Sequence, residues 1–232
     1  MRILRQHSEI SRGGGSTYTP AEMAGAILNL PSGGGGISVD DIAMQNITGD
    51  IVFTTATIVK NKPFSSMPIT SAGGTSVTEI KGEAFRYCSS LASISFPNVT
   101  KFSGGNNEFG GCTALTQAMF PKLSEWSSCF YAFADCTNLA VCDLGSIASM
   151  NNNTFNGCTS LRTLILRKTG SICTANWWNA AVFGGLYNNP TQSTIYVPQA
   201  LISTYQTATN WSSAYASGVT FKKIEGSIYE LS

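Results

Sequence analysis

Apolar residues recur along the middle of the chain with a period of about two dozen residues. The pattern Phe-x-x-Cys-x-x-Leu begins at Phe85, Phe109, Phe133 and Phe155, at intervals of 24, 24 and 22 residues (109 − 85, 133 − 109, 155 − 133). Four matches at three fixed positions are far beyond chance. A unit of this length cannot bury its own apolar edge, whereas stacked units bury equivalent side chains in continuous ladders. The pattern therefore predicts a stack of repeated units.

Each unit continues with a short strand pattern after its leucine. Apolar and polar residues alternate with period two, which is typical of a β-strand with one buried face, in Ile94-x-Phe96, Ala118-x-Phe120, Cys142-x-Leu144 and Leu164-x-Leu166. Pro97 and Pro121 then end the strand, because proline cannot donate a hydrogen bond to the ladder. Turns rich in Gly or Asn lead into the next Phe. We therefore expect a mainly β fold with short helices.

The seven cysteines follow from the same repeat. An odd number cannot form a complete intrachain disulfide set, and the chain has no Cys-x-x-Cys pair and a single histidine, His7. A zinc site therefore has almost no ligands, and we predict no metal and no cofactor. We interpret the repeat cysteines as small buried hydrophobic residues. The alternative is that the cysteines carry out redox or nucleophilic chemistry. This is disfavoured because no histidine lies near any of them in the sequence.

Composition narrows the class of protein. Charged residues make up only 12 % of the chain, about half of the roughly 25 % usual in soluble domains, while hydrophobic residues make up 43 %. The formal net charge of +1 gives no field that would recruit nucleic acid or an anionic membrane. No apolar run is long enough to span a bilayer, and residues 1–12 lack the apolar core of a signal peptide. We expect neither a nucleic-acid partner nor a membrane.

The repeat resembles the BspA-type leucine-rich repeat, over roughly residues 76–200. The segment from Thr194 to Pro198, followed by Tyr205 and Trp211, is similar to the closing segment that commonly follows such repeats. The resemblance implies a leucine-rich-repeat solenoid (76–198) with a helical C-terminal cap (199–232), in which residues 199–215 are helical. Between Arg167 and Thr194 the signature is absent, and we expect an enlarged loop there.

The N-terminal region differs in character. Residues 1–36 contain two glycine runs, which predict an arm, and in it Thr19, Pro20 and Glu22 predict the start of a short helix. The segment 18–27 resembles a short element of structural proteins of phages and prophages of gut Gram-positive bacteria, where it accompanies the same repeats. Residues 37–75 predict a β-rich N-terminal cap or a small separate module.

Candidate catalytic groups are few. His7 lies in a terminus that we expect to be solvated, and Asp40-Asp41 are typical of residues that cap a turn or short helix. Neither the glycine runs nor the carboxylates match a phosphate loop or a paired-acid site. We therefore predict no catalytic residues and expect that the protein is not an enzyme.

Binding is the better hypothesis, with two candidate surfaces. Alternation along the strands predicts an outward line of Ser95, Met119, Asp143, Ile165 and Tyr196 beside a second line of Ser93, Gln117, Val141 and Thr163. Exposed Met119, Ile165 and Tyr196 would make an apolar contact stripe, unless a neighbouring subunit or the N-terminal arm covers this face. The loop with Trp177-Trp178 is the second candidate, for stacking on sugar rings or anchoring a partner.

These patterns and resemblances together predict a phage virion protein. The N-terminal arm would attach to other virion proteins, and the repeats would be displayed toward a host cell-surface protein or glycan. By analogy with fibre and decoration proteins we expect a homo-oligomer, with a trimer as the first hypothesis. Two alternatives remain open: a bacterial BspA-like cell-surface adhesin, and a capsid or tail cement protein without a receptor.

Overall fold

The computed structural model describes residues 49–231 except 54–55, 127–128, 151–152 and 176. Residues 1–36 lie outside the described residues, and so do Asp40 and Asp41. The predictions of a solvated His7, of a helix that starts at Thr19 and of a capping role for Asp40-Asp41 therefore concern residues that the structure does not describe. No helix in the described part of the chain is both long and apolar enough to cross a bilayer.

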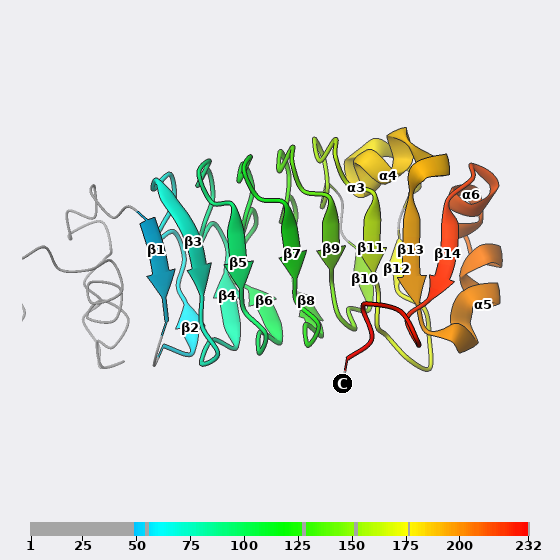
Figure 1. Ribbon diagram of the computed structural model, residues 1–232, viewed down its shortest axis with the longest axis horizontal. Helices are drawn as coiled ribbons and strands as arrows, with labels where there is room; N and C mark the ends of the chain where they lie inside the picture. Colours follow the sequence, from blue (N-terminus) through cyan, green and yellow to red (C-terminus); the bar gives the residue numbers. More distant parts are fainter. Residues whose placement is uncertain (1–48, 54–55, 127–128, 151–152, 176, 232) are drawn as a thin grey trace, which may run out of the picture.

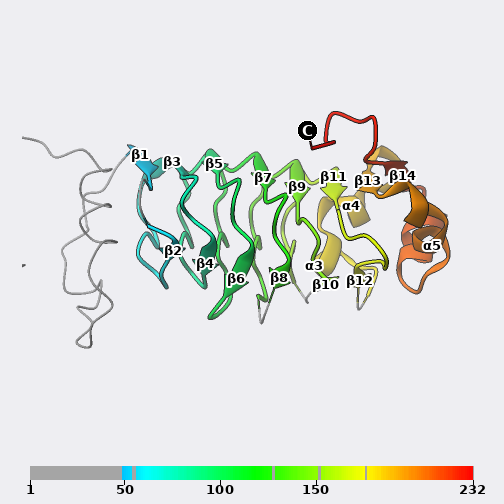
Figure 2. The same ribbon diagram turned by 90° about the horizontal axis from the view of Figure 1, so that it is seen from below.

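Two rows of parallel strands run along the length of the molecule (Figures 1 and 2). One row consists of a three-stranded sheet, β1 (Gly49–Val52), β3 (Ile69–Gly73) and β5 (Ser93–Ser95), and a five-stranded sheet, β7 (Gln117–Met119), β9 (Val141–Asp143), β11 (Thr163–Ile165), β13 (Thr194–Val197) and β14 (Thr220–Lys223). The other row consists of β2 (Ile58–Val59), β4 (Glu79–Lys81), β6 (Lys101–Ser103) and β8 (Glu125–Trp126), followed by the pair β10 (Ser149–Met150) and β12 (Thr174–Ala175).

The register explains the spacing of the repeats. In the five-stranded sheet Ala118 pairs with Cys142, Cys142 with Leu164 and Leu164 with Ile195. All four side chains are fully buried in the contiguous core. Equivalent positions of successive units thus lie beside one another, as the period-two alternation predicts. The mainly β fold with parallel sheets and few short helices agrees with the expected class.

The ladders begin earlier in the chain than the four sequence matches indicate. β1 pairs with β3, β3 pairs with β5, and β2 pairs with β4, so these first strands share the sheets of the repeats that follow. β1, β2 and β3 fall within the range 37–75 for which we expected a cap or a small module.

Phenyl rings form a ladder in the core, next to the turns that precede the strands β3, β5, β7, β9 and β11. Consecutive ring centroids lie 5.4, 5.2, 5.6 and 5.8 Å apart, and the rings are stacked, in the order Phe64, Phe85, Phe109, Phe133 and Phe155. The first of these rings belongs to Phe64-x-x-Met67, a unit in which methionine replaces cysteine. The sequence pattern missed this unit because it required the cysteine.

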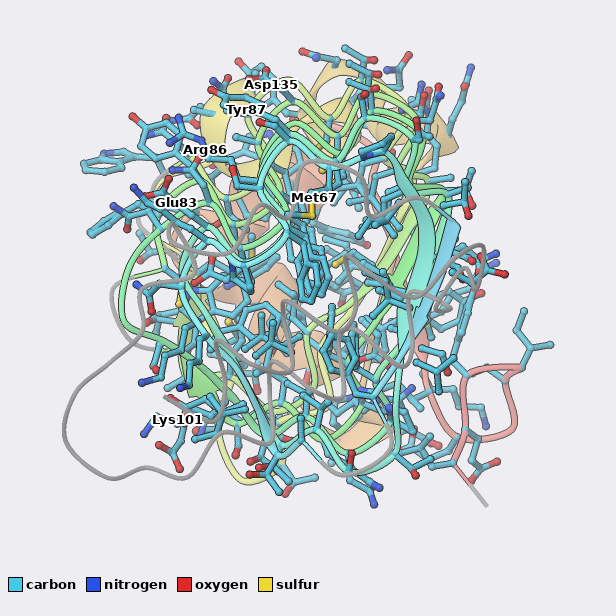
Figure 3. The ribbon with its side chains drawn as sticks, turned by 90° about the vertical axis from the view of Figure 1, so that its left-hand side faces the viewer. Met67, Glu83, Arg86, Tyr87, Lys101 and Asp135 are labelled. Atoms are coloured by element: carbon cyan, nitrogen blue, oxygen red, sulfur yellow. The ribbon has the colours of Figure 1, made fainter. Side chains whose placement is uncertain are left out.

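Each turn around the phenyl ladder contains two left-handed backbone positions, two residues before and two residues after the Phe. The second position is Ser66, Tyr87, Gly111, Asp135 or Gly157, with φ of 62°, 60°, 78°, 59° and 75°. Figure 3, which looks along the stack from its N-terminal end, places Glu83, Tyr87 and Asp135 at the same edge of the cross-section. Three of the five units therefore hold a side chain where glycine is favoured.

This backbone requirement gives a testable pair of substitutions. We expect Gly157→Ala to destabilise the protein by about 1–2 kcal/mol, because a Cβ is unfavourable in this conformation. The added Cβ would also lie 3.1 Å from the Cα of Asp135. Asp135→Gly, at the same position one unit earlier, should instead leave stability unchanged or raise it. Urea unfolding measures the free energy of unfolding of both variants. If Gly157→Ala left this free energy unchanged, the left-handed backbone conformation given to Gly157 would be wrong.

Short helices occupy the C-terminal third of the molecule. The segment after β12 forms α3 (Ala180–Phe183), α4 (Gly185–Asn188) and the 3-10 turn η2 (Pro190–Gln192). After β13 come η3 (Gln199–Leu201), α5 (Ile202–Thr207) and α6 (Trp211–Ala216). The expectation of one helix over 199–215 is wrong: Ala208 has an extended backbone and Asn210 a positive φ, which break it into two.

Two aromatic side chains fix these helices to the repeats. The backbone N–H of Cys173 donates to the Tyr205 hydroxyl at 2.8 Å, and the indole N–H of Trp211 donates to the carbonyl of Cys173, also at 2.8 Å. Both rings are fully buried. The helices α5 and α6 therefore lie at the C-terminal end of the stack (Figures 1 and 2), and β14 pairs in parallel with β13 beside them.

Candidate functional site

The outward line of side chains across the sheet is exposed only in part. The register places Met119 beside Asp143, Asp143 beside Ile165, and Ile165 beside Tyr196, as predicted. Ser95 is exposed, and Met119 and Tyr196 are half-buried. Asp143 and Ile165 are fully buried, so the expectation of an exposed stripe is wrong at these two positions.

An ion pair accounts for the burial of Asp143. Its Oδ2 accepts from Nη2 of Arg167 at 2.6 Å and from Nε at 2.8 Å, while Oδ1 accepts from the backbone N–H of Gly145 at 2.9 Å. Burial raises the pKa of Asp143, and the bonds from Arg167 and Gly145 oppose that rise. Both oxygens of the carboxylate thus accept hydrogen bonds within the structure, and the group is not exposed to solvent.

The C-terminal tail, residues 224–231, lies on this face beside the other buried position, Ile165. After β14 it turns back across the outer side of β13 and β11 (Figures 1 and 2). The rings of Tyr229 and Tyr196 meet edge to face with centroids 4.8 Å apart, and the carboxylate of Glu225 accepts from the backbone N–H of Gln199. Ile165 is buried without belonging to the contiguous core, as expected of a side chain covered from outside.

The tail therefore leaves only the first part of this face open. The neighbouring line follows the same trend, exposed at its first two positions and half-buried at the last two, in the order Ser93, Gln117, Val141 and Thr163. The open residues are small or polar and form no continuous apolar patch, which weakens the case for this face as an interaction surface.

A groove opens instead at the C-terminal end of the stack, between the segment after β12 and helix α6. Its volume is about 530 Å³, within the range of ligand sites. The lining side chains are aromatic, amide or hydroxyl-bearing, and none is charged: Trp177, Trp178, Asn179, Tyr187, Asn210, Ser213 and Ser217. The structure thus places both tryptophans of the predicted loop in one groove.

The two tryptophans have different roles in the groove. Trp177 is 55 % exposed, which is unusual for a residue type that is mostly buried. Trp178 is partly buried and packs on Phe183 with ring centroids 4.5 Å apart, and Tyr187 meets it edge to face at 5.5 Å. Phe183 in turn contacts Trp211 in the core at 5.2 Å. A chain of rings therefore connects the groove rigidly to the core.

Polar contacts fix the walls of the groove. The side-chain oxygen of Asn179 accepts from the N–H of Val182 and caps α3, and the side-chain nitrogen of Asn210 donates to the carbonyl of Ala175 at 2.7 Å. The hydroxyl of Ser217 donates to the carbonyl of Ser213 within α6. The walls therefore present amide and hydroxyl groups whose positions are set before any ligand arrives.

Sequence reasoning identified the tryptophans but missed Tyr187 and the residues of α6. Tyr187 belongs to α4 and contacts Trp178 directly, whereas Ser213 comes from a later segment that only the docking of α6 brings to the groove. The available signal was the loss of the Phe-x-x-Cys signature after Arg167, because a segment that leaves the repeat is free to form a site.

The cysteine ladder has a structural role. Each thiol donates to the carbonyl of the Phe one unit earlier, at 2.8 Å for Cys88, 3.1 Å for Cys112 and Cys136, and 2.8 Å for Cys158. Burial raises the pKa of Cys88 to about 12. At Cys136 burial raises the pKa whereas the neighbouring thiols lower it, and its S–H···O bond requires the proton. Cysteine thus adds a weak donor to the small apolar volume that we predicted.

We expect the thiols to be unreactive in the folded protein. All seven cysteines are buried and none is in a disulfide. An aromatic disulfide reagent should therefore label no thiol on the timescale that labels free cysteine, and seven after unfolding in guanidinium chloride. One thiol that reacts in the native state at the rate of free cysteine would contradict this and reopen the redox alternative.

Glu108 is a charged residue within the ladder of turns. Glu108 is fully buried at the position before the Phe, which Ala84 and Ala132 occupy in the two adjoining units. Burial raises its pKa to about 7, and the Cys129 thiol opposes the rise. No lysine or arginine among the described residues forms an ion pair with it. The group lies in the core, away from the groove.

Comparison with known proteins identifies the repeat. The family model of the BspA type leucine rich repeat region matches residues 55–179 in six copies, which is more than half of the chain. The match starts before the range that we recognised in the sequence and ends within the Trp177 loop. No curated protein matches the chain. The resemblance of the N-terminal segment to phage structural proteins stays a prediction. Among the described residues no cluster of three or more His, Cys, Asp or Glu could hold a metal ion.

Proposed function

Since the chain belongs to the BspA-type leucine-rich-repeat family, we propose that it is a non-enzymatic binding protein that presents a rigid repeat stack to a cell-surface ligand. Repeats of this type indicate a surface or binding protein. The observation that carries the proposal is the groove with Trp177 and Trp178: an exposed, uncharged, aromatic site held on the core by tilted and edge-to-face ring contacts. In contrast, Asp143 is paired with Arg167, and the thiols are buried, so these groups have structural roles.

The proposal includes an architecture. The stacked units form a leucine-rich-repeat solenoid, and α5 and α6 close its C-terminal end as a helical cap. Support comes from the two rows of parallel strands and from the docking of Tyr205 and Trp211 on Cys173. A stack of this kind needs a terminal unit that covers its apolar end.

Binding of the labelled full chain to intact bacterial cells tests the function. We expect saturable binding to cells of at least one Gram-positive species, displaced by excess unlabelled protein. Asp135→Gly, which lies far from the groove along the stack, should bind equally. Absence of saturable binding to every species would overturn the proposal. Shortening of the cell-wall polysaccharide during incubation would instead indicate an enzyme.

We further propose that the protein is part of a phage virion and attaches through residues 1–36 to other virion proteins. The support is the resemblance of segment 18–27, together with the same repeats. Mass spectrometry of purified particles, beside a surface-shaved fraction of intact cells, tests this location. Stoichiometric recovery with capsid and tail proteins is the expected result, and recovery from the cell surface alone would favour the bacterial adhesin.

A homo-oligomer, with a trimer as the first hypothesis, completes the proposal by analogy with fibre and decoration proteins. Light scattering of the full chain after size-exclusion chromatography should give three times the mass of one chain. A mass of 24.6 kDa would show a monomer and remove this part of the proposal.

A further inference from the structure

We propose that the groove lined by Trp177, Trp178 and Tyr187 binds a neutral oligosaccharide. This inference rests on the proposed binding function and names the class of ligand and its site. It excludes, for this groove, an anionic glycan and an apolar peptide. Three properties of the groove support it: the exposed aromatic faces, the neutral polar walls and the rigidity of the floor.

The aromatic faces suit a sugar ring. One face of a pyranose carries C–H groups with a small positive charge, and the face of an indole or phenol ring is negative, so the two attract when they stack. Trp177 and Tyr187 are 55 % and 41 % exposed, and Trp178 lies between the groove and the core. Exposed indole area of this size costs free energy in the unliganded protein, and a stacked ligand would remove it from water.

The polar groups suit hydroxyls rather than charges. The lining residues offer only amide and hydroxyl side chains, from Asn179, Asn210, Ser213 and Ser217. An anion would need arginine or lysine to compensate for its lost hydration, and none lines the groove. An apolar peptide side chain would offer no hydrogen-bonding groups to these polar walls in place of the water that it displaces. A neutral sugar, with donors and acceptors around its edge and C–H groups on its face, matches both parts.

The fixed geometry lowers the entropic cost of binding. Trp178 is held by Phe183 and Tyr187, and Phe183 by the buried Trp211. Asn179 is fixed by its cap on α3 and Asn210 by its bond to Ala175. A site whose side chains are already ordered loses little rotamer freedom when the ligand arrives.

Titration with defined oligosaccharides tests the inference. The neutral probes are cellohexaose, chitohexaose, maltohexaose and mannohexaose. Hexagalacturonate is the anionic control. We expect at least one neutral hexamer, and not the anionic one, to change tryptophan fluorescence and to bind measurably in calorimetry. Trp177→Ala should weaken that binding at least tenfold. Tyr215→Ser, on α6 but outside the groove, should bind as the wild type.

The outcomes separate this inference from the proposed function. If no neutral hexamer binds, or if Trp177→Ala binds as tightly as the wild type, the oligosaccharide site is wrong. If the full chain still binds cells saturably in that case, the binding function stands and another surface carries it. Preferential binding of the anionic hexamer would also overturn the inference. Retained circular dichroism and unfolding midpoint show that Trp177→Ala is folded.

Discussion

Replacing Arg167 with methionine should destabilise the protein by about 3–5 kcal/mol, because the change leaves a buried carboxylate without its partner. Arg167 is 9 % exposed and Asp143 0 %, and two nitrogens of the guanidinium contact one carboxylate oxygen. The N–H of Gly145 then remains as the donor to Asp143. Guanidinium chloride unfolding at pH 7 measures the change in the free energy of unfolding.

The double variant Asp143→Met/Arg167→Met is the matched control. Met119 and Ile165 already occupy the neighbouring rungs, so an apolar side chain fits this line, and the double variant should recover most of the lost stability. In the single variant the pKa of Asp143 rises further, so the destabilisation should grow as pH increases. A loss below about 1 kcal/mol for Arg167→Met would show that the ion pair is solvated, contrary to its burial.

Glu108 should make the stability of the protein fall as pH rises through the weakly acidic range. Its pKa is about 7 in the folded protein against an ordinary value of 4.5. The folded state therefore holds the proton more tightly, and the favourable contribution is complete below pH 4.5 and lost by about pH 7. A difference of this size corresponds to about 3 kcal/mol.

Glu108→Gln removes the pH dependence of stability that Glu108 contributes. The difference between the variant and the wild type therefore reports on Glu108 alone and not on the other titrating groups. We expect the variant to be more stable than the wild type by about 3 kcal/mol at pH 8, and by far less at pH 4.5. Glu125→Gln, at an exposed pair with Lys101, should change stability by less than about 1 kcal/mol at either pH. A Glu108→Gln effect that is equal at pH 4.5 and pH 8 would refute the raised pKa.

Much of the fold follows from the repeated pattern. The Phe, Cys and Leu positions are the buried ladders, because one residue type at a fixed spacing must face the same side in every unit. The first unit escaped detection because Met67 stands where the others have cysteine. The left-handed turn positions also escaped, since Tyr87 and Asp135 give no sequence sign of a conformation that glycine adopts in other units.

The candidate surfaces were harder to predict, because exposure depends on what covers a strand. Alternation placed Asp143 and Ile165 correctly on the outward line, but both are buried. No local pattern shows that Arg167 pairs with Asp143, or that the C-terminal tail lies against Tyr196 beside Ile165. Likewise Trp177 and Trp178 were visible as an unusual pair, whereas Ser213 joins them only through the docking of α6. Contacts between segments distant in sequence decide both surfaces.

Hydrogen–deuterium exchange of the full chain tests most directly whether the groove is the binding surface. The chain is compared with and without a saturating cell-wall polysaccharide fraction from a species that it binds. We predict slower exchange in residues 177–188 and 210–217, with the backbone of β5 and β7 unchanged. Protection confined to β5 and β7, or no protection of the groove at saturation, would contradict the account and return the outward sheet face as the site.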